Sequence, residues 1–238
     1  MNNLDQVNTR DSDLFVASYP RSGNYWLRFM LGTYLHDIDI DWNNFKQYCP
    51  MIYHLDGIQA HQLSNPRVFG VHNMYNKVPN SIYIHRDPRD VVISLYFYYL
   101  KRGHIDYGFN DFFDGFINED ISTFGCWHDN VNSWLSNADY ILSYDNLQDN
   151  ASKELEHILS YFNYKIDFKK INHSVYWCRF ENMKKLEKKQ NYLRYKSKKD
   201  IDFIRKGKSK QWKDFLSDKQ KSLMLEDFGG IMERLGYI

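Results

Sequence analysis

Residues 14–35 constrain the fold of this chain more than any other stretch. An apolar run at 14–19 has the length of a β-strand, and Pro20 ends it because proline has no N–H to donate to a sheet. A short polar turn follows at 21–24, and from 25 to 35 the side chains are apolar on nearly every side, as in a buried helix. The sequence therefore predicts a strand, a tight polar turn and a buried helix in direct succession.

The turn between this strand and this helix has the features of an anion-binding site. Backbone N–H groups at the start of a helix have no partner within it, and the helix dipole favours negative charge there. Arg21 adds a positive charge and Ser22 a hydroxyl donor. The Walker A spacing G-x-x-x-x-G-K-[ST] is absent, because Gly23 is the only glycine in the turn. Taken alone, the turn is equally compatible with an Arg21 that is merely solvated.

Length and composition favour one α/β domain over residues 1–238, with a flexible N-terminus at 1–12. Hydrophobic residues at 43% can fill a large core, and aromatic residues at 17% favour aromatic-lined pockets. The net charge of +1 gives no general argument for a nucleic-acid or membrane partner. The polar residues 1–13 contain no apolar segment typical of a leader, which predicts a cytoplasmic protein.

Positive charge gathers late in the chain. From Lys184 to Lys213 there are 13 Lys and Arg against three acids. Such a segment is either a solvated face or a part that closes over a polyanionic ligand. Residues 190–210 have little to bury, and we expect them to form a mobile basic segment.

The three cysteines, Cys49, Cys126 and Cys178, are far apart and lack C-x-x-C spacing. This pattern supports neither a disulfide framework nor a zinc site. We expect buried or half-buried thiols in a reducing compartment.

Strand-to-helix units recur along the chain. Further strands are predicted at 67–72, 81–85 and 138–144, and amphipathic helices follow the last two. Such units predict a central parallel sheet flanked by helices on both faces. Past residue 165 the sequence predicts helices only, at 172–189 and at 218–235, the second broken by two glycines.

Two further places offer chemistry at strand ends, where open α/β sheets bind ligands. His72 closes an apolar run, and an imidazole there can take a proton from an attacking hydroxyl, although a lone histidine is more often structural. Arg86 follows the 81–85 strand, and Ser94 lies almost two helical turns beyond Asp87. Arg86 and Ser94 therefore either converge on one anion or serve as a paired arginine and a solvated serine.

The start of the helix after Arg86 carries its own capping signals. Asp87 is expected to cap the helix and Pro88 suits its first position. Asp90, three residues after the cap, is expected to act as the acid of a capping box.

Four separated segments resemble motifs of the sulfotransferases that use 3′-phosphoadenosine 5′-phosphosulfate (PAPS). Residues 19–26, YPRSGNYW, resemble the 5′-phosphosulfate loop T-Y-P-K-S-G-T-T-W, and 86–94 resemble the 3′-phosphate motif. Residues 144–147 are similar to Y-E-D-[LM], and the run from 205 to 213 resembles the late R-K-G…W-K segment. The resemblance implies the family's α/β fold with a P-loop-like phosphosulfate site, and sulfonate transfer from PAPS, leaving 3′-phosphoadenosine 5′-phosphate (PAP).

The resemblance also implies a role for individual residues. The 5′-phosphosulfate would be held by Arg21, Ser22, Gly23, Asn24 and Tyr25. The 3′-phosphate would be held by Arg86, Ser94, Arg205, Lys206 and Gly207. The adenine would lie near Trp26, Tyr144 and Phe180. His72 would be the general base and Arg21 would stabilise the leaving 5′-phosphate, with no metal required.

The chain departs from the family pattern in ways that bear on the site. The loop lysine is Arg21, and the lysine usual two residues before the histidine is Gly70, so that either Arg21 or Lys77 would supply its charge. The glycine and acid usual before the late tryptophan are Lys210 and Gln211. No family dimer motif follows, which leaves the oligomeric state open.

The acceptor is expected to be a small molecule with a hydroxyl or, less favoured, an amine; a glycan is an alternative. Its walls are predicted to include Tyr53, His54, Tyr75, Phe97 and Tyr98, although these are equally compatible with ordinary core aromatics.

Two other function classes compete with the sulfotransferase hypothesis. A nucleotide-dependent phosphotransferase, such as a P-loop kinase, shares the strand, loop and helix. It also needs a Walker lysine and a carboxylate that binds Mg²⁺, and the sequence shows neither. A nucleic-acid-binding module would explain the basic segment at 184–213 but not Arg86 with Ser94.

Overall fold

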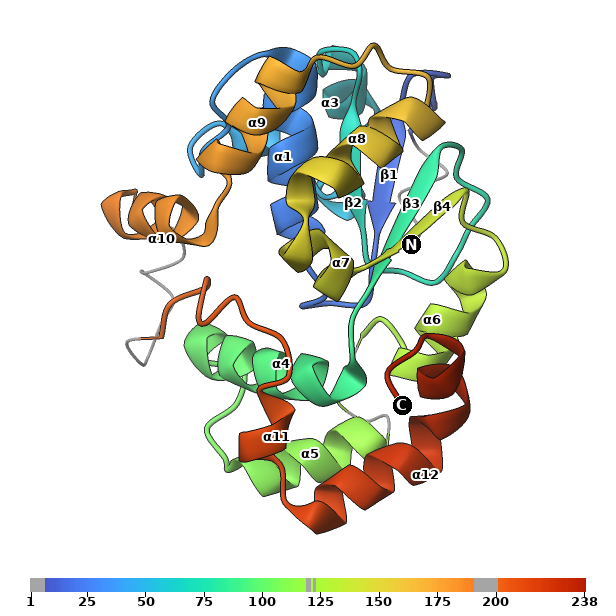
Figure 1. Cartoon of the computed structure of the whole chain (residues 1–238), viewed down its shortest axis with the longest axis vertical. Coiled ribbons are helices and arrows are strands. Elements are labelled where there is room, and N and C mark those ends of the chain that lie inside the picture. The colour runs from blue at the N-terminus through green and yellow to red at the C-terminus, as the bar shows by residue number, and fades with distance from the viewer. Residues whose placement is uncertain (1–6, 119–120, 122, 191–200) are drawn as a thin grey trace.

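A four-stranded parallel sheet lies at the centre of the computed structural model, which describes residues 7–118, 121, 123–190 and 201–238. The strand order is β2-β1-β3-β4 (Figure 1). The strands are β1 (Leu14–Ala17), β2 (Val68–Val71), β3 (Ser81–His85) and β4 (Tyr140–Ser143). The parallel sheet predicted from the strand-to-helix units is confirmed, and each predicted strand is present.

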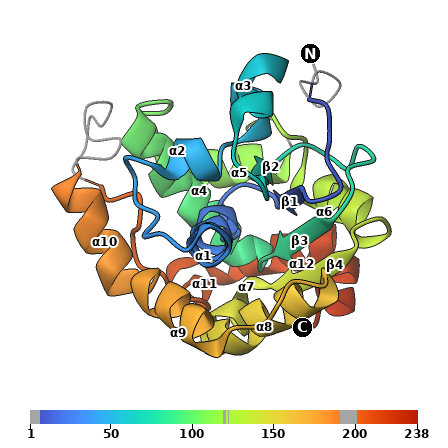
Figure 2. The same cartoon turned by 90° about the horizontal axis from the view of Figure 1, so that it is seen from above.

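Helices cover both faces of this sheet, as predicted. The first half of the chain contributes α1 (Asn24–His36), α2 (Phe45–Tyr48), the 3₁₀ helix η2 (Ile52–His54), α3 (Gly57–Gln62), α4 (Pro88–Arg102) and α5 (Phe109–Ile117). The second half contributes α6 (Trp127–Leu135), α7 (Tyr144–Asp149), α8 (Ala151–Tyr161), α9 (Phe168–Trp177), α10 (Phe180–Lys189), α11 (Trp212–Phe215) and α12 (Asp218–Arg234). Figure 2 shows α8, α9 and α10 following one another along one edge of the molecule.

The alternation of side chains along the strands divides the core in two. On β1, Phe15 and Ala17 belong to one apolar cluster, which α4, α5, α6 and α12 complete, whereas Val16 belongs to the other, with α1, α8 and α9. On β3, Tyr83 faces the first cluster and Ile82 the second. Because successive strand residues point to opposite faces, continuous apolar strands require helices on both sides.

The strand order places a topological switch point between β1 and β3. The chain leaves β1 for β2 on one side of the sheet and leaves β3 for β4 on the other side. The loops after β1 and β3 therefore diverge at the carboxyl edge of the sheet and leave a crevice between them. The predicted anion-binding turn at 21–24 and the start of the predicted motif at 86–94 lie at this edge.

Two helical predictions need correction. The helix predicted at 172–189 is two helices, because the chain turns at Cys178, whose carbonyl accepts a hydrogen bond from Trp26 Nε1 (2.8 Å). The helix predicted to break at the glycines is continuous over Asp218–Arg234. Buried Met224, Phe228 and Met232 recur every four residues along α12, and their packing outweighs the low helix propensity of two glycines.

The expected mobile segments fall partly outside the described residues, namely at 1–6 and 191–200. Residues 201–211 form an irregular loop that runs beside α4 (Figure 1). Among the described helices, none combines the length and the apolar character needed to cross a membrane.

Candidate active site

The loop after β1 has the backbone geometry of an anion-binding nest. Arg21 and Gly23 both have positive φ angles, 71° and 105°, on either side of Ser22. Such alternation turns successive N–H groups toward a common point. A Cβ atom at Gly23 would lie 2.8 Å from the Tyr144 ring, so this position admits only glycine without a shift.

Ser22 is the clearest unsatisfied group in this loop. Its side chain is fully buried, yet within the described structure its Oγ has no hydrogen-bond partner. No side chain caps the start of α1, which follows directly. Since buried polar groups are normally paired, the loop presents donors that lack an acceptor, as an anion site does.

Arg21 lies at the centre of the site. Its Nε donates to Ser94 Oγ (3.2 Å), and its Nη2 donates to the carbonyl of Phe203 (3.0 Å). Its guanidinium also stacks over the rings of Tyr98 and Phe203, at 5.0 and 4.5 Å from their centroids. Burial lowers the pKa of Arg21 to about 10, so the side chain keeps its charge at neutral pH.

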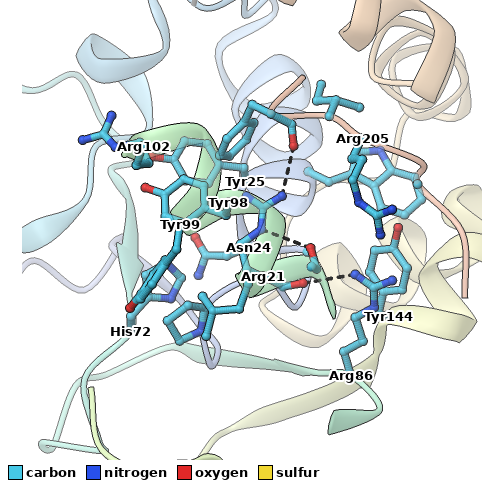
Figure 3. A pocket seen from close by; sticks show the side chains of 18 of the residues that line it. Arg21, Asn24, Tyr25, His72, Arg86, Tyr98, Tyr99, Arg102, Tyr144 and Arg205 are labelled. Atoms are coloured by element: carbon cyan, nitrogen blue, oxygen red, sulfur yellow. Dashed lines mark hydrogen bonds between the residues drawn. The ribbon is translucent and has the colours of Figure 1, made fainter. Parts of the chain in front are cut away.

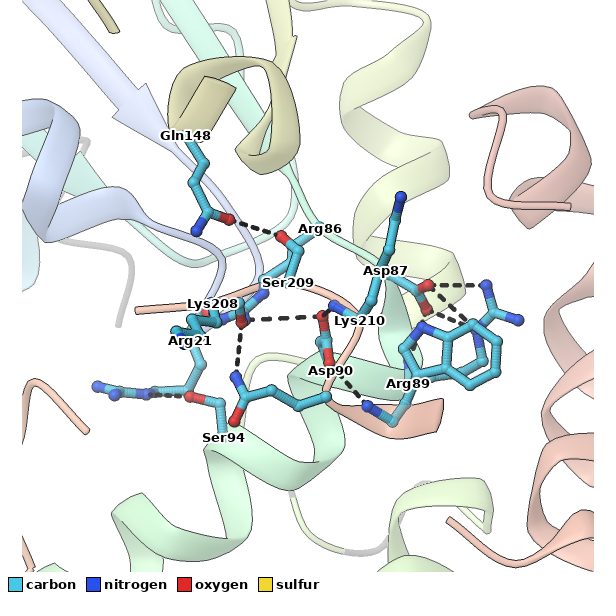
Figure 4. A network of polar contacts seen from close by, with 12 residues as sticks. Arg21, Arg86, Asp87, Arg89, Asp90, Ser94, Gln148, Lys208, Ser209 and Lys210 are labelled. Carbon is cyan, nitrogen blue, oxygen red and sulfur yellow. Dashed lines mark hydrogen bonds and ion pairs between the residues drawn. The ribbon is translucent and has the colours of Figure 1, made fainter. Parts of the chain in front are cut away.

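Arg86 joins the loop after β1 to the basic loop late in the chain (Figure 4). Its Nη1 donates to the Arg21 carbonyl (3.2 Å), and its Nη2 donates to the Lys208 carbonyl (2.9 Å). Its guanidinium lies over the Tyr144 ring, 4.3 Å from the centroid. Its Nε is buried and has no partner among the described residues. Arg86 Nη2 also lies 3.8 Å from Asp90 Oδ2, so Arg86 pairs with a neighbouring acid as one alternative expected. Ser94 instead accepts from Arg21, and the binding of one anion by Arg86 and Ser94 stays a prediction.

Asp90 has a different role from the one predicted. Asp87 does cap α4, accepting from Arg89 N (2.9 Å), but Asp90 takes no part in a capping box. Its carboxylate accepts from the backbone N–H of Lys210 (2.6 Å) and of Trp212 (3.2 Å). The reason is tertiary: the late loop crosses the start of α4 and offers Asp90 better donors than its own helix does. Asp90 therefore ties the basic loop to the site.

Gln148, on α7, is a second anchor for the same loop. Its side chain donates to the Gly207 carbonyl (2.8 Å) and accepts from Ser209 Oγ (2.9 Å). Arg205 is held over the Phe97 ring (4.4 Å) and donates to Gln211 (2.8 Å). These contacts bring the predicted residues 205–207 close to Arg86 and Ser94, although more than a hundred residues separate them in the sequence.

Glu187, on α10, is a buried anchor that was not predicted from the sequence. Its carboxylate accepts from Lys101 Nζ (3.3 Å), from the Ile204 N–H (2.8 Å) and from the Phe203 N–H. Both charged side chains are almost fully buried, with 2% and 3% exposure. The pair fixes the strand-like segment whose Phe203 carbonyl accepts from Arg21.

We expect Glu187→Gln to lower the free energy of unfolding by about 3 kcal/mol, because it leaves the Lys101 charge buried without its partner. Urea unfolding measures this loss. The matched control is Lys184→Met, which removes the half-exposed pair with Asp202 and should cost less than about 1 kcal/mol. Equal losses for the two variants would contradict the assigned role of the buried pair.

His72 follows β2 directly and lines the site with 8% exposure. Its Nδ1 lies 2.8 Å from the Ser18 carbonyl, which can only accept, so Nδ1 carries the proton and Nε2 has its lone pair available. Burial lowers the pKa of His72 to about 4, and the charges of Arg28 and Arg21 act in the same direction. The imidazole is therefore neutral at neutral pH, the form that a proton acceptor requires.

Arg28, on α1, occupies the space beside position 70, where the family usually has a lysine. Its guanidinium fills the space beside Gly70, where a Cβ would lie 2.5 Å from Arg28 Cζ. Arg28 is fully buried and donates from Nε to Asn24 Oδ1 (2.7 Å). Lys77, in contrast, is exposed and does not line the site. Two cations, Arg28 and Arg21, thus lie within electrostatic reach of His72, and Arg28 was not among the residues considered.

One cavity of about 670 Å³ collects nearly all the predicted residues (Figure 3). The predicted cofactor and catalytic residues that line it are Arg21, Gly23, Asn24, Tyr25, Trp26, His72, Arg86, Ser94, Tyr144, Phe180, Arg205, Lys206 and Gly207. Ser22 is buried beneath this wall. The cavity volume is within the usual range for small-molecule sites.

The predicted acceptor walls divide into two groups. Tyr53, His54 and Tyr98 line the cavity, but Tyr75 and Phe97 do not. The Tyr75 ring packs edge-on against Trp134 (5.1 Å), and Phe97 packs under Arg205. These two are structural aromatics, because helix α6 and the basic loop cover the faces that a ligand would need.

Other lining residues were not predicted from the sequence. They are Trp42, Leu95, Tyr99, Arg102, His104, Ile121, Thr123, Phe124, Met183, Phe203, Ile204 and Gln211. Tyr99 and Arg102 were within reach of sequence reasoning, since they follow Ser94 at helical spacing on α4. Leu95 lies on α4 and Met183 on α10, and most of the others come from irregular segments without a periodic signal.

All three cysteines are free and buried, as predicted. Cys126, His128 and Asp129 place ligand-type atoms within 4.8 Å of one another at the start of α6. None of the three lines the cavity.

The family of the chain follows from comparison with known proteins. A family model described as the sulfotransferase domain matches residues 11–236. The chain belongs to the sulfotransferase family. The predicted sulfotransferase family is thereby confirmed, and the protein is a sulfotransferase enzyme.

Curated relatives and solved structures agree with this assignment. Sulfotransferase 1 family member D1 of Mus musculus is 26% identical over 258 residues, covering 97% of this chain and 86% of the relative. Sulfotransferase 2A1 of Homo sapiens is 25% identical over 250 residues, covering 96% and 86%. The fold is similar to that of mouse sulfotransferase SULT7A1 complexed with PAP, with a TM-score of 0.74 and 21% identity, covering 99% of this chain and 92% of that one. It is also similar to retinol dehydratase in a complex with retinol and PAP, with a TM-score of 0.75 and 18% identity, covering 97% of this chain and 84% of that one.

Proposed function

We propose that this sulfotransferase transfers the sulfonate of PAPS to a hydroxyl of a small-molecule acceptor, with His72 as general base. One observation carries the proposal: a single cavity joins the anion-binding loops of β1 and β3 to the unprotonated Nε2 of His72. The names of the similar structures support the same cofactor, since they describe complexes with PAP.

The residues at the cofactor end fit a polyanionic nucleotide. Ser22 Oγ and Arg86 Nε are buried and lack partners within the described structure. A nucleotide with an anionic group at each end would give each of them an acceptor. The nest at Arg21 and Gly23 would hold the 5′-phosphosulfate, and Arg86, Ser94 and residues 205–207 would hold the 3′-phosphate. Trp26, Tyr144 and Phe180 supply aromatic surface for the adenine.

The reaction requires alignment and charge stabilisation more than covalent help from the protein. PAPS supplies an activated sulfonate. His72 Nε2 accepts the proton of the acceptor hydroxyl, while Nδ1–H stays bonded to the Ser18 carbonyl and keeps the ring in place. Arg21, charged and largely dehydrated, stabilises the negative charge that develops on the leaving 5′-phosphate.

The acceptor end favours a small molecule with an aromatic or other flat apolar body. Tyr53, Tyr98, Tyr99 and Phe124 line this part of the cavity. The similar structures include retinol dehydratase complexes with retinol and with androsterone, both small molecules. The aromatic side chains along this part of the cavity suit such a compound better than an extended glycan.

Calorimetric titration tests the cofactor assignment. We expect PAP to bind at physiological salt, and expect ATP–Mg²⁺ and a single-stranded oligonucleotide to bind at least about tenfold more weakly, because they lack the paired 3′- and 5′-phosphates. A screen of hydroxyl-bearing acceptors with radiolabelled PAPS then tests transfer. If PAP did not bind, the proposed function would be wrong.

A further inference from the structure

The charge of the cavity wall is strongly one-sided. Its cationic residues are Arg21, Arg86, Arg102, Arg205 and Lys206. Among the described residues that line it there is no aspartate or glutamate. Since arginines in partly buried sites are normally balanced, this wall is built for negatively charged ligands.

Four of these five cations are accounted for by the proposed cofactor site, but Arg102 is not. Figure 3 shows Arg86 and Arg205 on one side of Arg21 and Tyr98, and Arg102 on the opposite side. Arg102 lies in the last turn of α4, two helical turns beyond Ser94, and in Figure 3 it is on the same side of Arg21 as Tyr99 and His72, with its guanidinium directed away from His72. It therefore belongs to the acceptor end.

Arg102 has an unsatisfied donor. Its Nε is buried and has no hydrogen-bond partner, and no carboxylate of the described residues forms an ion pair with it. Lys101, the preceding residue, points to the other side of the helix and is paired with Glu187. The helix dipole favours a cation in the last turn, but it supplies no acceptor to Nε. Within the part of the chain that the structure describes, Nε therefore has a free donor, and a bound ligand could supply its acceptor.

The surroundings of Arg102 define the shape of that partner. Tyr98, Tyr99 and Phe124 line the same end of the cavity, so a ring fits there. Burial raises the pKa of Tyr98, and the charge of Arg102 opposes that rise, which places the guanidinium within electrostatic reach of the aromatic wall. One guanidinium neutralises one negative charge and matches a carboxylate with two parallel donors.

We propose that the acceptor of this sulfotransferase is a hydroxylated aromatic compound that carries a carboxylate, and that Arg102 binds this carboxylate. The proposal rests on the proposed function, because it assigns the other cations to the cofactor. Arg102 would orient the acceptor so that its hydroxyl faces His72, and it would discriminate against neutral and cationic phenols.

The test compares three phenols of similar size with different charge: 4-hydroxyphenylacetate, 4-hydroxyphenylethanol and tyramine. Their binding to the PAP-saturated enzyme is measured by calorimetry, and their sulfonation by radiolabelled PAPS. We expect the carboxylate to bind about 10- to 100-fold more tightly than the alcohol, with tyramine weakest. Arg102→Gln should remove this preference, and Arg102→Lys should restore part of it.

The matched control is Arg234→Gln, which removes an exposed arginine of α12 outside the cavity and should leave the order of the three phenols unchanged. Equal binding of the carboxylate and the alcohol, no binding of either, or a preference that survives in Arg102→Gln would overturn the proposal. PAP affinity is measured on the same samples. Failure of PAP to bind would reject the proposed function itself, whereas normal PAP affinity without a charge preference rejects only the role of Arg102.

Discussion

Replacing His72 with alanine is expected to lower kcat about 100- to 10,000-fold while the affinity for PAP stays unchanged. The loss is the usual contribution of a positioned general base. Cofactor binding should persist because the side chain contacts the Ser18 carbonyl and the cavity, not the anion-binding loop. Steady-state turnover with an accepted phenol and calorimetry with PAP measure the two quantities separately. Turnover that survives in the variant would exclude His72 as the base.

The pH profile of the unmodified enzyme gives an independent check on His72. A base must be unprotonated to act, and burial lowers the pKa of His72 from its ordinary 6.5 to about 4. We therefore expect kcat/KM, measured at low substrate concentration, to stay constant as the pH falls through 6.5. It should decline only as the pH approaches about 4. An acid limb centred near 6.5 would indicate a solvated histidine instead.

Replacing Arg86 with glutamine is expected to weaken PAP binding by about 2–3 kcal/mol, or roughly 30- to 150-fold. The buried guanidinium already donates to the carbonyls of Arg21 and Lys208, so it is held in place before any ligand arrives. The N–H of its Nε has no acceptor among the described residues. A phosphate bound there would lose a charge-assisted hydrogen bond that a neutral amide cannot replace.

A second ligand separates this role from a merely structural one. Adenosine 5′-phosphate lacks the 3′-phosphate, so its affinity should change little in Arg86→Gln. Arg86→Lys should recover part of the PAP affinity through its charge alone. If both nucleotides weakened equally, Arg86 would be acting through the shape of the loop and not at the 3′-phosphate.

Local sequence patterns were sufficient for the parts of the fold that depend on nearest neighbours. The 81–85 strand was predicted at its observed bounds, and the first strand and helix within a few residues. Pro20, Asp87 and Pro88 act on the backbone within a few residues of themselves, so their effects can be read directly from the chain. The same holds for the turn at Arg21, where one glycine and a helix start define the anion site.

Contacts between distant segments could not be predicted in the same way. Asp90 was expected to bond within its own helix, but a loop 120 residues later supplies better donors. Tyr75 and Phe97 were expected to face a ligand, but α6 and Arg205 cover them. Arg28 was overlooked because nothing in the sequence shows that its guanidinium fills the space beside Gly70.

The sequence by itself determined the α/β class and the strand, turn and helix at 14–35, because strand and helix periodicity, proline and glycine act locally. Most of the cavity residues that it predicted came from the resemblance of four motifs to the sulfotransferases. Only the tertiary structure decided how these segments meet. It placed Arg86 against Arg21 and the basic loop against α4, and it left Arg102 Nε buried without a partner among the described residues. The physical reason is that burial, ion pairing and packing depend on which distant segments approach, and a one-dimensional pattern does not contain those distances.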